Sequence, residues 1–239
     1  MSKAQINGEA SEIVEAGKAR ASEVSKVIEP SEFVEASETK FSKRQQEVLS
    51  AVLDLMVRES GTLTMERVAK SASCSKETLY KWFGDRQGLL TATVQWQASK
   101  VRISPIDGDA LDEATLRDAL EGFARDWLLV LTSDVSIALN RMAISHAGSA
   151  SSDLGSIVLQ NGPFAMRRRL LPVLVMGRDA GYLDFENGGE AFSRFFGLVV
   201  RDIQIRVLLG EDVSLNGAQI KREARIATHQ FFTLYGKKT

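Results

Sequence analysis

The sequence predicts an all-α protein of about nine helices, with a small basic helix-turn-helix unit followed by a larger helical domain. From residue 41 onward, apolar residues recur at spacings of three and four, which is the period of an amphipathic helix. Serine, threonine, aspartate and glycine stand where these stretches begin and end. No stretch alternates between polar and apolar residues as a half-buried strand does.

The composition excludes several classes of protein. The chain has 239 residues, of which 44% are hydrophobic and 26% charged, enough for two modest domains. A single cysteine, Cys74, excludes an intramolecular disulfide, and two distant histidines offer no metal-ligand spacing. No window approaches a membrane span, and the N-terminus lacks the pattern of a secretory signal. We expect a cytoplasmic protein with no membrane contact, no metal and no cofactor.

The charge is unevenly distributed. Residues 1–40 carry a net charge of −3, residues 41–103 carry +4, and residues 104–239 carry −2. Because nucleic-acid binding depends on local charge, the block 41–103 is the candidate DNA-binding domain. Residues 1–40 contain few large apolar side chains, so we expect a flexible acidic N-terminal extension; a partner-binding segment is the alternative.

The basic block divides into four helical stretches, the first from residue 41 to near residue 61. Thr64 can cap a second, short helix, which ends at the polar run 73–75. Ser75 can cap a third over residues 76–83, and Asp85 can cap a fourth that runs to about residue 101. Short helices joined by a three-residue turn and packed on longer neighbours form a helix-turn-helix, here of three helices.

Residues 63–90 resemble the DNA-binding unit of the TetR family of transcriptional regulators. The family's pattern appears as Thr64, Val68-Ala69, Ser75-x-x-Thr78-Leu79-Tyr80-x-x-Phe83 and Arg86-x-x-Leu89-Leu90. Arg86 replaces lysine, and Cys74 stands where valine is usual. Arginine still contacts phosphate and cysteine packs as a small apolar group, so the chemistry is retained. The resemblance implies a homodimer that binds double-stranded operator DNA.

The third helix has a polar outer side, because Leu79 and Phe83 take its inner side. Lys76 can donate to guanine, and Glu77 can accept from cytosine or repel wrong sequences. A surface ion pair between Glu77 and Lys81, four residues apart, is the alternative that needs no DNA. Phosphate contacts are assigned to Thr64, Tyr80, Lys81 and Arg86. The predicted DNA-binding residues are Thr64, Ser75, Lys76, Glu77, Thr78, Tyr80, Lys81 and Arg86.

Beyond a boundary at residues 103–109, which contain a proline and a glycine, the chain shows only helical patterns. The predicted helices cover residues 112–131, 134–147, 153–181, 188–209 and 216–235. Interruptions are expected at Gly162-Pro163 and Pro172. We expect residues 110–239 to form a helical domain for ligand binding and dimerisation.

In the TetR family the last two helices supply the dimer interface. In the stretch 188–209, apolar residues cover more of the helix circumference than one neighbouring helix can bury. In the stretch 216–235 they form one apolar face at spacings of three and four. The predicted interface residues are Phe195, Val199, Ile203, Ala224, Phe231 and Leu234. The segments 134–148 and 195–210 are also similar to the AefR-like subgroup of the family.

A ligand pocket among the preceding helices is the other expectation from the resemblance. An apolar cavity with a few polar groups suits a small, largely apolar effector, and plain core packing is the alternative for each lining residue. The candidates are Phe123, Trp127, Leu131, Asn140, Met142, His146, Phe164, Met166 and Phe196, with Gln160 as a further polar group.

The leading hypothesis is a repressor that such an effector releases from its operator. The alternative is a TetR-like protein that is regulated by a protein partner. The sequence has no glycine-rich phosphate loop, nucleophile elbow or cluster of histidine, cysteine and glutamate, so we do not expect an enzyme.

Overall fold

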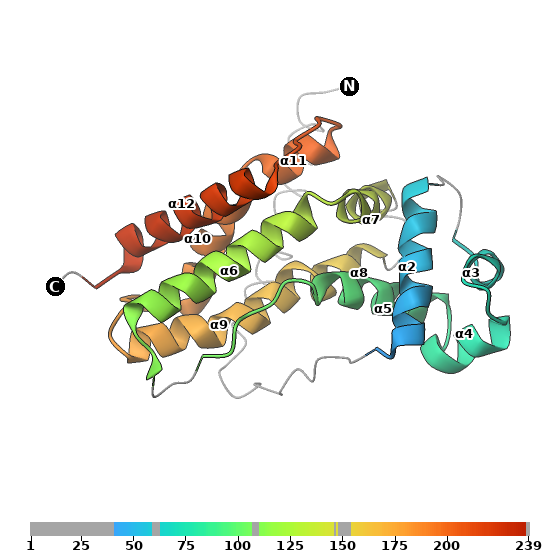
Figure 1. The fold of residues 1–239 in the computed structure, drawn as a ribbon, viewed down its shortest axis with the longest axis horizontal. Helices are drawn as coiled ribbons and strands as arrows, with labels where there is room; N and C mark the ends of the chain where they lie inside the picture. Colours follow the sequence, from blue (N-terminus) through green and yellow to red (C-terminus); the bar gives the residue numbers. More distant parts are fainter. Residues whose placement is uncertain (1–40, 59–62, 107–109, 146, 148–153, 238–239) are drawn as a thin grey trace, which may run out of the picture. The chain divides into compact units, whose positions relative to one another are not determined.

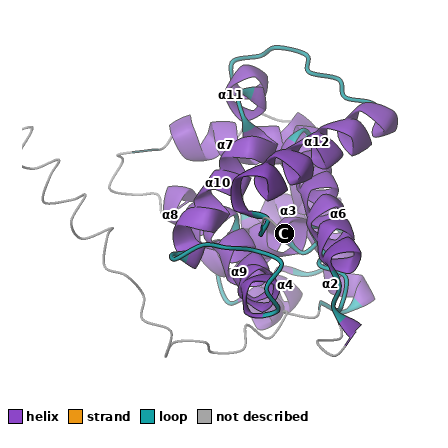
Figure 2. Ribbon diagram, turned by 90° about the vertical axis from the view of Figure 1, so that its left-hand side faces the viewer, coloured by secondary structure: helices purple, strands orange, loops and turns teal. Residues whose placement is uncertain are grey.

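The computed structural model describes residues 41–58, 63–106, 110–145, 147 and 154–237. Within these ranges every regular element is a helix, as Figure 2 shows. The one β-type contact among the described residues is an isolated bridge between Leu183 and Gly236. The all-α class predicted from the periodicity is thus confirmed. The predicted extension, residues 1–40, lies outside the described residues. Helices are numbered as in Figure 1, beginning with α2.

The predicted DNA-binding domain consists of α2 (Lys43–Arg58), α3 (Met65–Ser71), α4 (Lys76–Phe83) and α5 (Arg86–Ala98). The last three begin at the caps expected from the sequence. The Thr64 hydroxyl accepts a hydrogen bond from the backbone N–H of Arg67 at 3.3 Å. Ser75 and Asp85 cap α4 and α5 in the same way, at 3.1 and 2.7 Å. Each cap satisfies one N–H that has no partner inside its helix.

These helices share one apolar core with α7 (Asp134–Ser145) and α8 (Leu154–Asn161). Leu79 of α4 is fully buried in this core, and Leu139 of α7 and Ile157 of α8 belong to the same cluster. Helix α2 packs on α7, and α5 packs on α8. A shift of α7 or α8 therefore displaces α2 or α5, on which α3 and α4 pack.

A second core lies among α6 (Glu113–Leu131), α9 (Pro163–Asp179), α10 (Gly188–Val200) and α12 (Gly217–Tyr235). Helix α12 packs along both α6 and α10, as Figure 1 shows for α6. Phe123, Phe195 and Phe231, which come from three of these helices, are fully buried between them. The short helix α11 (Ile203–Leu208) packs on α7.

The described helices number eleven, because two of the predicted ones are each divided. The stretch 153–181 breaks at Gly162-Pro163 into α8 and α9, as expected, since proline favours the first position of a helix. The stretch 188–209 breaks into α10 and α11 at Arg201, whose φ is +44°. The interruption expected at Pro172 was wrong: α9 continues through this residue.

None of the described helices is by itself long and apolar enough to cross a membrane. Helices α6 and α7 meet the length and composition limits only as a pair, and the pair is bent by 65°. In the structure the apolar side of α6, which includes Leu116, Leu120 and Phe123, lies in the second core.

Candidate nucleic-acid interface

Helix α4 presents a polar face to solvent. Ser75, Lys76, Glu77, Tyr80 and Lys81 are exposed, whereas Leu79 is fully buried and anchors the opposite side of the helix. Thr78 is half-buried, and its hydroxyl is 3.1 Å from that of Ser75. The structure therefore brings the six predicted residues of this helix and its cap together on one surface that can enter a groove.

Tyr80 is the large apolar residue of this surface, and 51% of it is exposed. An aromatic ring with a free edge and a hydroxyl suits a contact in which the ring packs on the sugar and the hydroxyl donates to phosphate. Lys81, the next residue, is also exposed and brings a positive charge to the same edge of α4.

Glu77 is ionised at neutral pH. Its pKa is lowered first by a hydrogen bond with its own backbone N–H and next by one with the Ser75 side chain. The carboxylate therefore has acceptor capacity only, and it can pair with an amino group such as cytosine N4 but is repelled by a phosphate.

Two arginines hold the ends of α3, a role that the sequence did not reveal. Arg44, on α2, donates from Nη2 to the carbonyl oxygens of Ala72 at 2.8 Å and Ser73 at 3.1 Å. Arg86, on α5, donates from Nε to the carbonyl oxygen of Leu63 at 2.8 Å. Both pairs are more than twenty residues apart in the chain, so no local pattern signals them.

Arg86 thus combines two functions in the geometry. Its Nε donates to Leu63, but the side chain is exposed, and no hydrogen bond from its terminal nitrogens to another described residue is observed. These nitrogens can therefore donate to a phosphate. Thr64, the neighbouring phosphate candidate, is also exposed at the start of α3. Arg86 and Thr64 lie at the same end of α3, as a shared phosphate contact requires.

Cys74 lies in the turn between α3 and α4 and is half-buried against the core that α2–α5 share with α7 and α8. Burial raises the pKa of its thiol, an effect that nearby Arg44 partly offsets. The thiol is therefore protonated at neutral pH and packs as a small apolar group, as its place in the sequence motif implies.

The predicted ligand-binding residues do not form one site. Phe123, Trp127, Leu131, Met166 and Phe196 all belong to the second core. The ring centroid of Trp127 is 5.5 Å from that of Phe123 and 5.0 Å from that of Phe196, so both phenylalanine rings pack on this tryptophan.

The other candidates lie elsewhere. Met142 packs against the core that α2–α5 share with α7 and α8, and Phe164 is 42% exposed. The amide of Asn140 donates to the carbonyl oxygen of Ser136 in its own helix. His146 lies outside the described residues.

Most of the predicted dimer-interface side chains are buried within one chain. Five of them have no more than a few per cent of their surface exposed: Phe195, Val199, Ile203, Ala224 and Phe231. Phe195 and Phe231 contact each other edge to face, with ring centroids 5.2 Å apart. While this core stays packed, these side chains cannot contact a second copy. Leu234, the sixth, is 60% exposed.

The physical reason is the position of α6. It packs against α12 and α10, so one apolar face of each helix is used inside the chain. The apolar circumference of the stretch 188–209 indicates more than one neighbour, and the described helices that pack on α10, namely α6, α9 and α12, all belong to the same chain.

Comparisons with known proteins agree with this fold. Residues 118–237 match the family described as the AefR-like transcriptional repressor, C-terminal domain. A TetR transcriptional regulator from Agrobacterium tumefaciens is 42% identical, and the match covers 83% of this chain and 97% of that one with a TM-score of 0.70. No curated protein matches the chain significantly.

Two further solved structures share the fold. The flavonoid-responsive regulator FrrA is 25% identical over 82% of this chain and 98% of its own, with a TM-score of 0.60. A TetR-family regulator from Mesorhizobium loti is 22% identical over 81% and 97%, with a TM-score of 0.64. With the family match to residues 118–237 and the 42% identity to the Agrobacterium protein, the chain belongs to the TetR family of transcriptional regulators.

Proposed function

We propose that the chain is a homodimeric repressor that binds a palindromic operator through α4 and releases it when a small, largely apolar effector binds the C-terminal domain. Regulators of this family are not enzymes; they are generally DNA-binding repressors and act as dimers. The proposal assigns these properties to particular residues of this chain.

The observation that carries the proposal is the exposed face of α4. Lys76 and Glu77 are exposed in its first turn, and we assign them to base edges, which they would meet if the helix enters the major groove N-terminus first. We assign phosphate contacts to exposed Tyr80 and Lys81, one turn later, and to Thr64 and Arg86 near the start of α3. Base contacts from the first pair give specificity, and phosphate contacts give affinity.

We assign the dimer contact to the outward side of α10 and α12. On α10 this side carries the small residues Ser193 and Gly197, and a side chain at Gly197 would meet open space. On α12 it carries exposed Ile226 and Leu234. Small residues on one helix and apolar residues on the other allow two copies to approach closely around a two-fold axis.

We place the apolar effector beside the aromatic cluster of Phe123, Trp127, Phe192 and Phe196. Three of these rings are buried, and Phe196 is half-buried, so the cluster reaches the surface at one point. The relative FrrA is described as flavonoid-responsive, which supports a ring-bearing effector for this fold. An aromatic molecule that stacks on Trp127 would have to displace Phe196.

The proposal is tested by selecting, from a pool of randomised duplex DNA, the duplexes that bind the purified protein. We expect a two-fold symmetric consensus whose half-sites lie about one helical turn apart or a multiple of it. Fluorescence anisotropy on the selected duplex should then give saturable binding with two protein chains per site. A selection that yields no consensus would contradict the proposal.

A further inference from the structure

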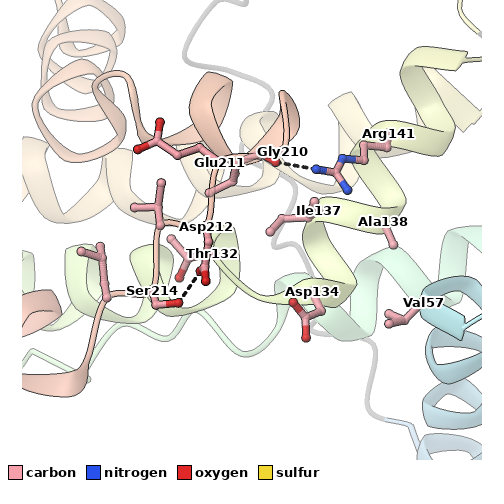
Figure 3. A pocket seen from close by; sticks show the side chains of 13 residues that line it. Val57, Thr132, Asp134, Ile137, Ala138, Arg141, Gly210, Glu211, Asp212 and Ser214 are labelled. Carbon is pink, nitrogen blue, oxygen red and sulfur yellow. Dashed lines mark hydrogen bonds between the residues drawn. The ribbon is translucent and has the colours of Figure 1, made fainter.

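A pocket of about 550 Å³ lies away from the aromatic cluster. Its walls come from α7, from the turn between α6 and α7, and from the segment 210–215 that follows α11. Figure 3 shows Asp134 and Ile137 of α7 on one side and Asp212 and Ser214 on the other. None of the described residues that the sequence suggested for ligand binding lines this pocket.

The pocket has two carboxylates that lack a counterion. Among the described residues neither Asp134 nor Asp212 has an ion-pair partner, and Asp212 accepts a hydrogen bond from the Ser214 hydroxyl. Glu211, the third acid of the lining, is instead paired with Arg206. With Glu211 paired to Arg206, the described lining still carries two carboxylates against the single positive charge of Arg141, and this excess of negative charge favours a cation as the occupant.

Among the described residues, the one arginine of the lining forms no ion pair with these carboxylates. Arg141 donates from Nη2 to the carbonyl oxygen of Val207 at 2.8 Å and from Nε to that of Leu208 at 3.1 Å. It therefore serves the C-terminal end of α11, where a cation offsets the partial negative charge of free carbonyls. This places Arg141 in the wall as a structural brace.

Five apolar side chains from α7, α11 and the following segment also line the pocket: Ile137, Ala138, Val207, Val213 and Leu215. Most of the surface that the pocket exposes is nevertheless polar. Carboxylates in a largely polar pocket with a few apolar side chains suit a small organic cation with a short apolar chain. A metal ion suits the pocket less well, because the described residues contain no group of three or more metal-ligating side chains.

The pocket touches the DNA-binding domain at two points. Val57, near the end of α2, is part of the lining. Ser133, between the lining residues Thr132 and Asp134, accepts a hydrogen bond at 3.1 Å from the side-chain amide of Gln97 on α5. Gln97 is only 5% exposed, and its side-chain Oε1 accepts a hydrogen bond from Nζ of Lys100 at 2.7 Å. The two hydrogen bonds hold the side-chain amide in one orientation.

We propose that this pocket binds a small organic cation, a protonated amine with a short apolar chain, and that its occupancy lowers operator affinity through α2 and the Ser133–Gln97 hydrogen bond. The binding half of the proposal is independent of the proposed function, and the regulatory half rests on it. An occupant that moves the turn between α6 and α7 moves α5, which packs on α4.

Binding is tested on the full chain without DNA. Thermal melting is followed with a series of primary amines, from butylamine to phenylpropylamine, each matched by the alcohol of the same skeleton, and with Mg²⁺ alone. We expect at least one amine, but neither its alcohol nor Mg²⁺, to raise the melting temperature in a saturable manner. A series without any such amine, or an equal response to the alcohols, would overturn the proposal.

Asp212→Asn and Asp134→Asn locate the site. Each should weaken binding of the active amine at least fivefold, whereas Asp118→Asn, an exposed aspartate of α6 outside the lining, should leave it unchanged. Asp212 lies outside any helix, so its variant avoids the helix-start effects that Asp134→Asn brings. Equal binding by wild type and Asp212→Asn would place the amine elsewhere and contradict the assignment.

The coupling is tested by anisotropy on the selected operator, with Gln97→Met as the variant that removes the hydrogen bond to Ser133 but keeps the volume. In wild type the amine should lower operator affinity about 5–150-fold. In Gln97→Met it should bind as before and lower operator affinity less. An amine that binds but leaves wild-type operator affinity unchanged would refute the coupling alone, and a protein that binds no operator would refute the proposed function alone.

Discussion

Nη2 of Arg44 donates to the carbonyl oxygen of Ala72 at 2.8 Å, across the turn of the helix-turn-helix. The same atom reaches the carbonyl oxygen of Ser73, whose φ of +49° lies in the region that non-glycine residues seldom adopt. The guanidinium thus braces the turn that sets the angle between α3 and α4.

We predict that Arg44→Met weakens operator binding at least tenfold and equally for cognate and altered half-sites, because α4 loses its fixed orientation. The slope of log K against log[salt] should stay as in wild type, since the residue positions the turn and does not contact phosphate. A slope smaller in magnitude for Arg44→Met than for wild type would identify a phosphate contact instead.

Tyr80 and Lys76 should give different phenotypes. Tyr80→Phe removes one hydroxyl that we assign to phosphate, so affinity should fall by a similar factor for every duplex. Lys76→Ala should lose about 1–3 kcal/mol on the cognate site and relax preference at one position of each half-site. Binding to a panel of single-base variants of the operator distinguishes the two, and a uniform loss for Lys76→Ala would place that lysine on the backbone.

Two aspartate substitutions on α12 should separate dimerisation from folding. Ile226→Asp places a charge on the exposed side and should give folded monomers with little operator affinity. Phe231→Asp places a charge in the second core, where Phe231 is fully buried, and should unfold the C-terminal domain. Sedimentation and circular dichroism on both variants decide the question; an Ile226→Asp protein that stays dimeric would rule out the proposed contact.

Removal of residues 1–40 should leave folding and operator specificity intact. This segment has few large apolar side chains and a net charge of −3, the wrong sign for phosphate. Operator affinity should be equal to or greater than that of the full chain. Melting curves and anisotropy of the truncated chain provide the measurement, and a melting temperature many degrees lower would show that the segment packs on the folded domain.

The sequence predicted those features that depend on local interactions. Thr64, Ser75 and Asp85 each bond to an N–H three residues further along, so a cap is visible in a short window. The burial of Leu79 between exposed neighbours follows from helix periodicity in the same way. The exposed face of α4 could therefore be predicted from the sequence.

Contacts between residues that lie far apart in the chain could not be predicted from the sequence. Nothing near Arg44 or Arg86 in the chain indicates the carbonyls of Ala72 and Leu63 that they bind. The apolar pattern at Phe195 and Phe231 is the same whether a helix of this chain or of a second chain covers it, and only the packing of α6 decides. The pocket depends on the path of segment 210–215, which has no periodicity to read.

The salt dependence of operator binding tests the central claim, that two copies of α4 bind DNA together. Two subunits, each with Lys81 and Arg86 on phosphates, give about four cation–phosphate contacts and a slope of log K against log[salt] of about −3.6. Lys81→Ala should reduce its magnitude by about 2, because the dimer loses two such contacts. We expect this loss of two phosphate contacts, one in each subunit, on the selected operator. A slope near zero in wild type, or a slope that Lys81→Ala leaves unchanged, would contradict binding by two copies of α4.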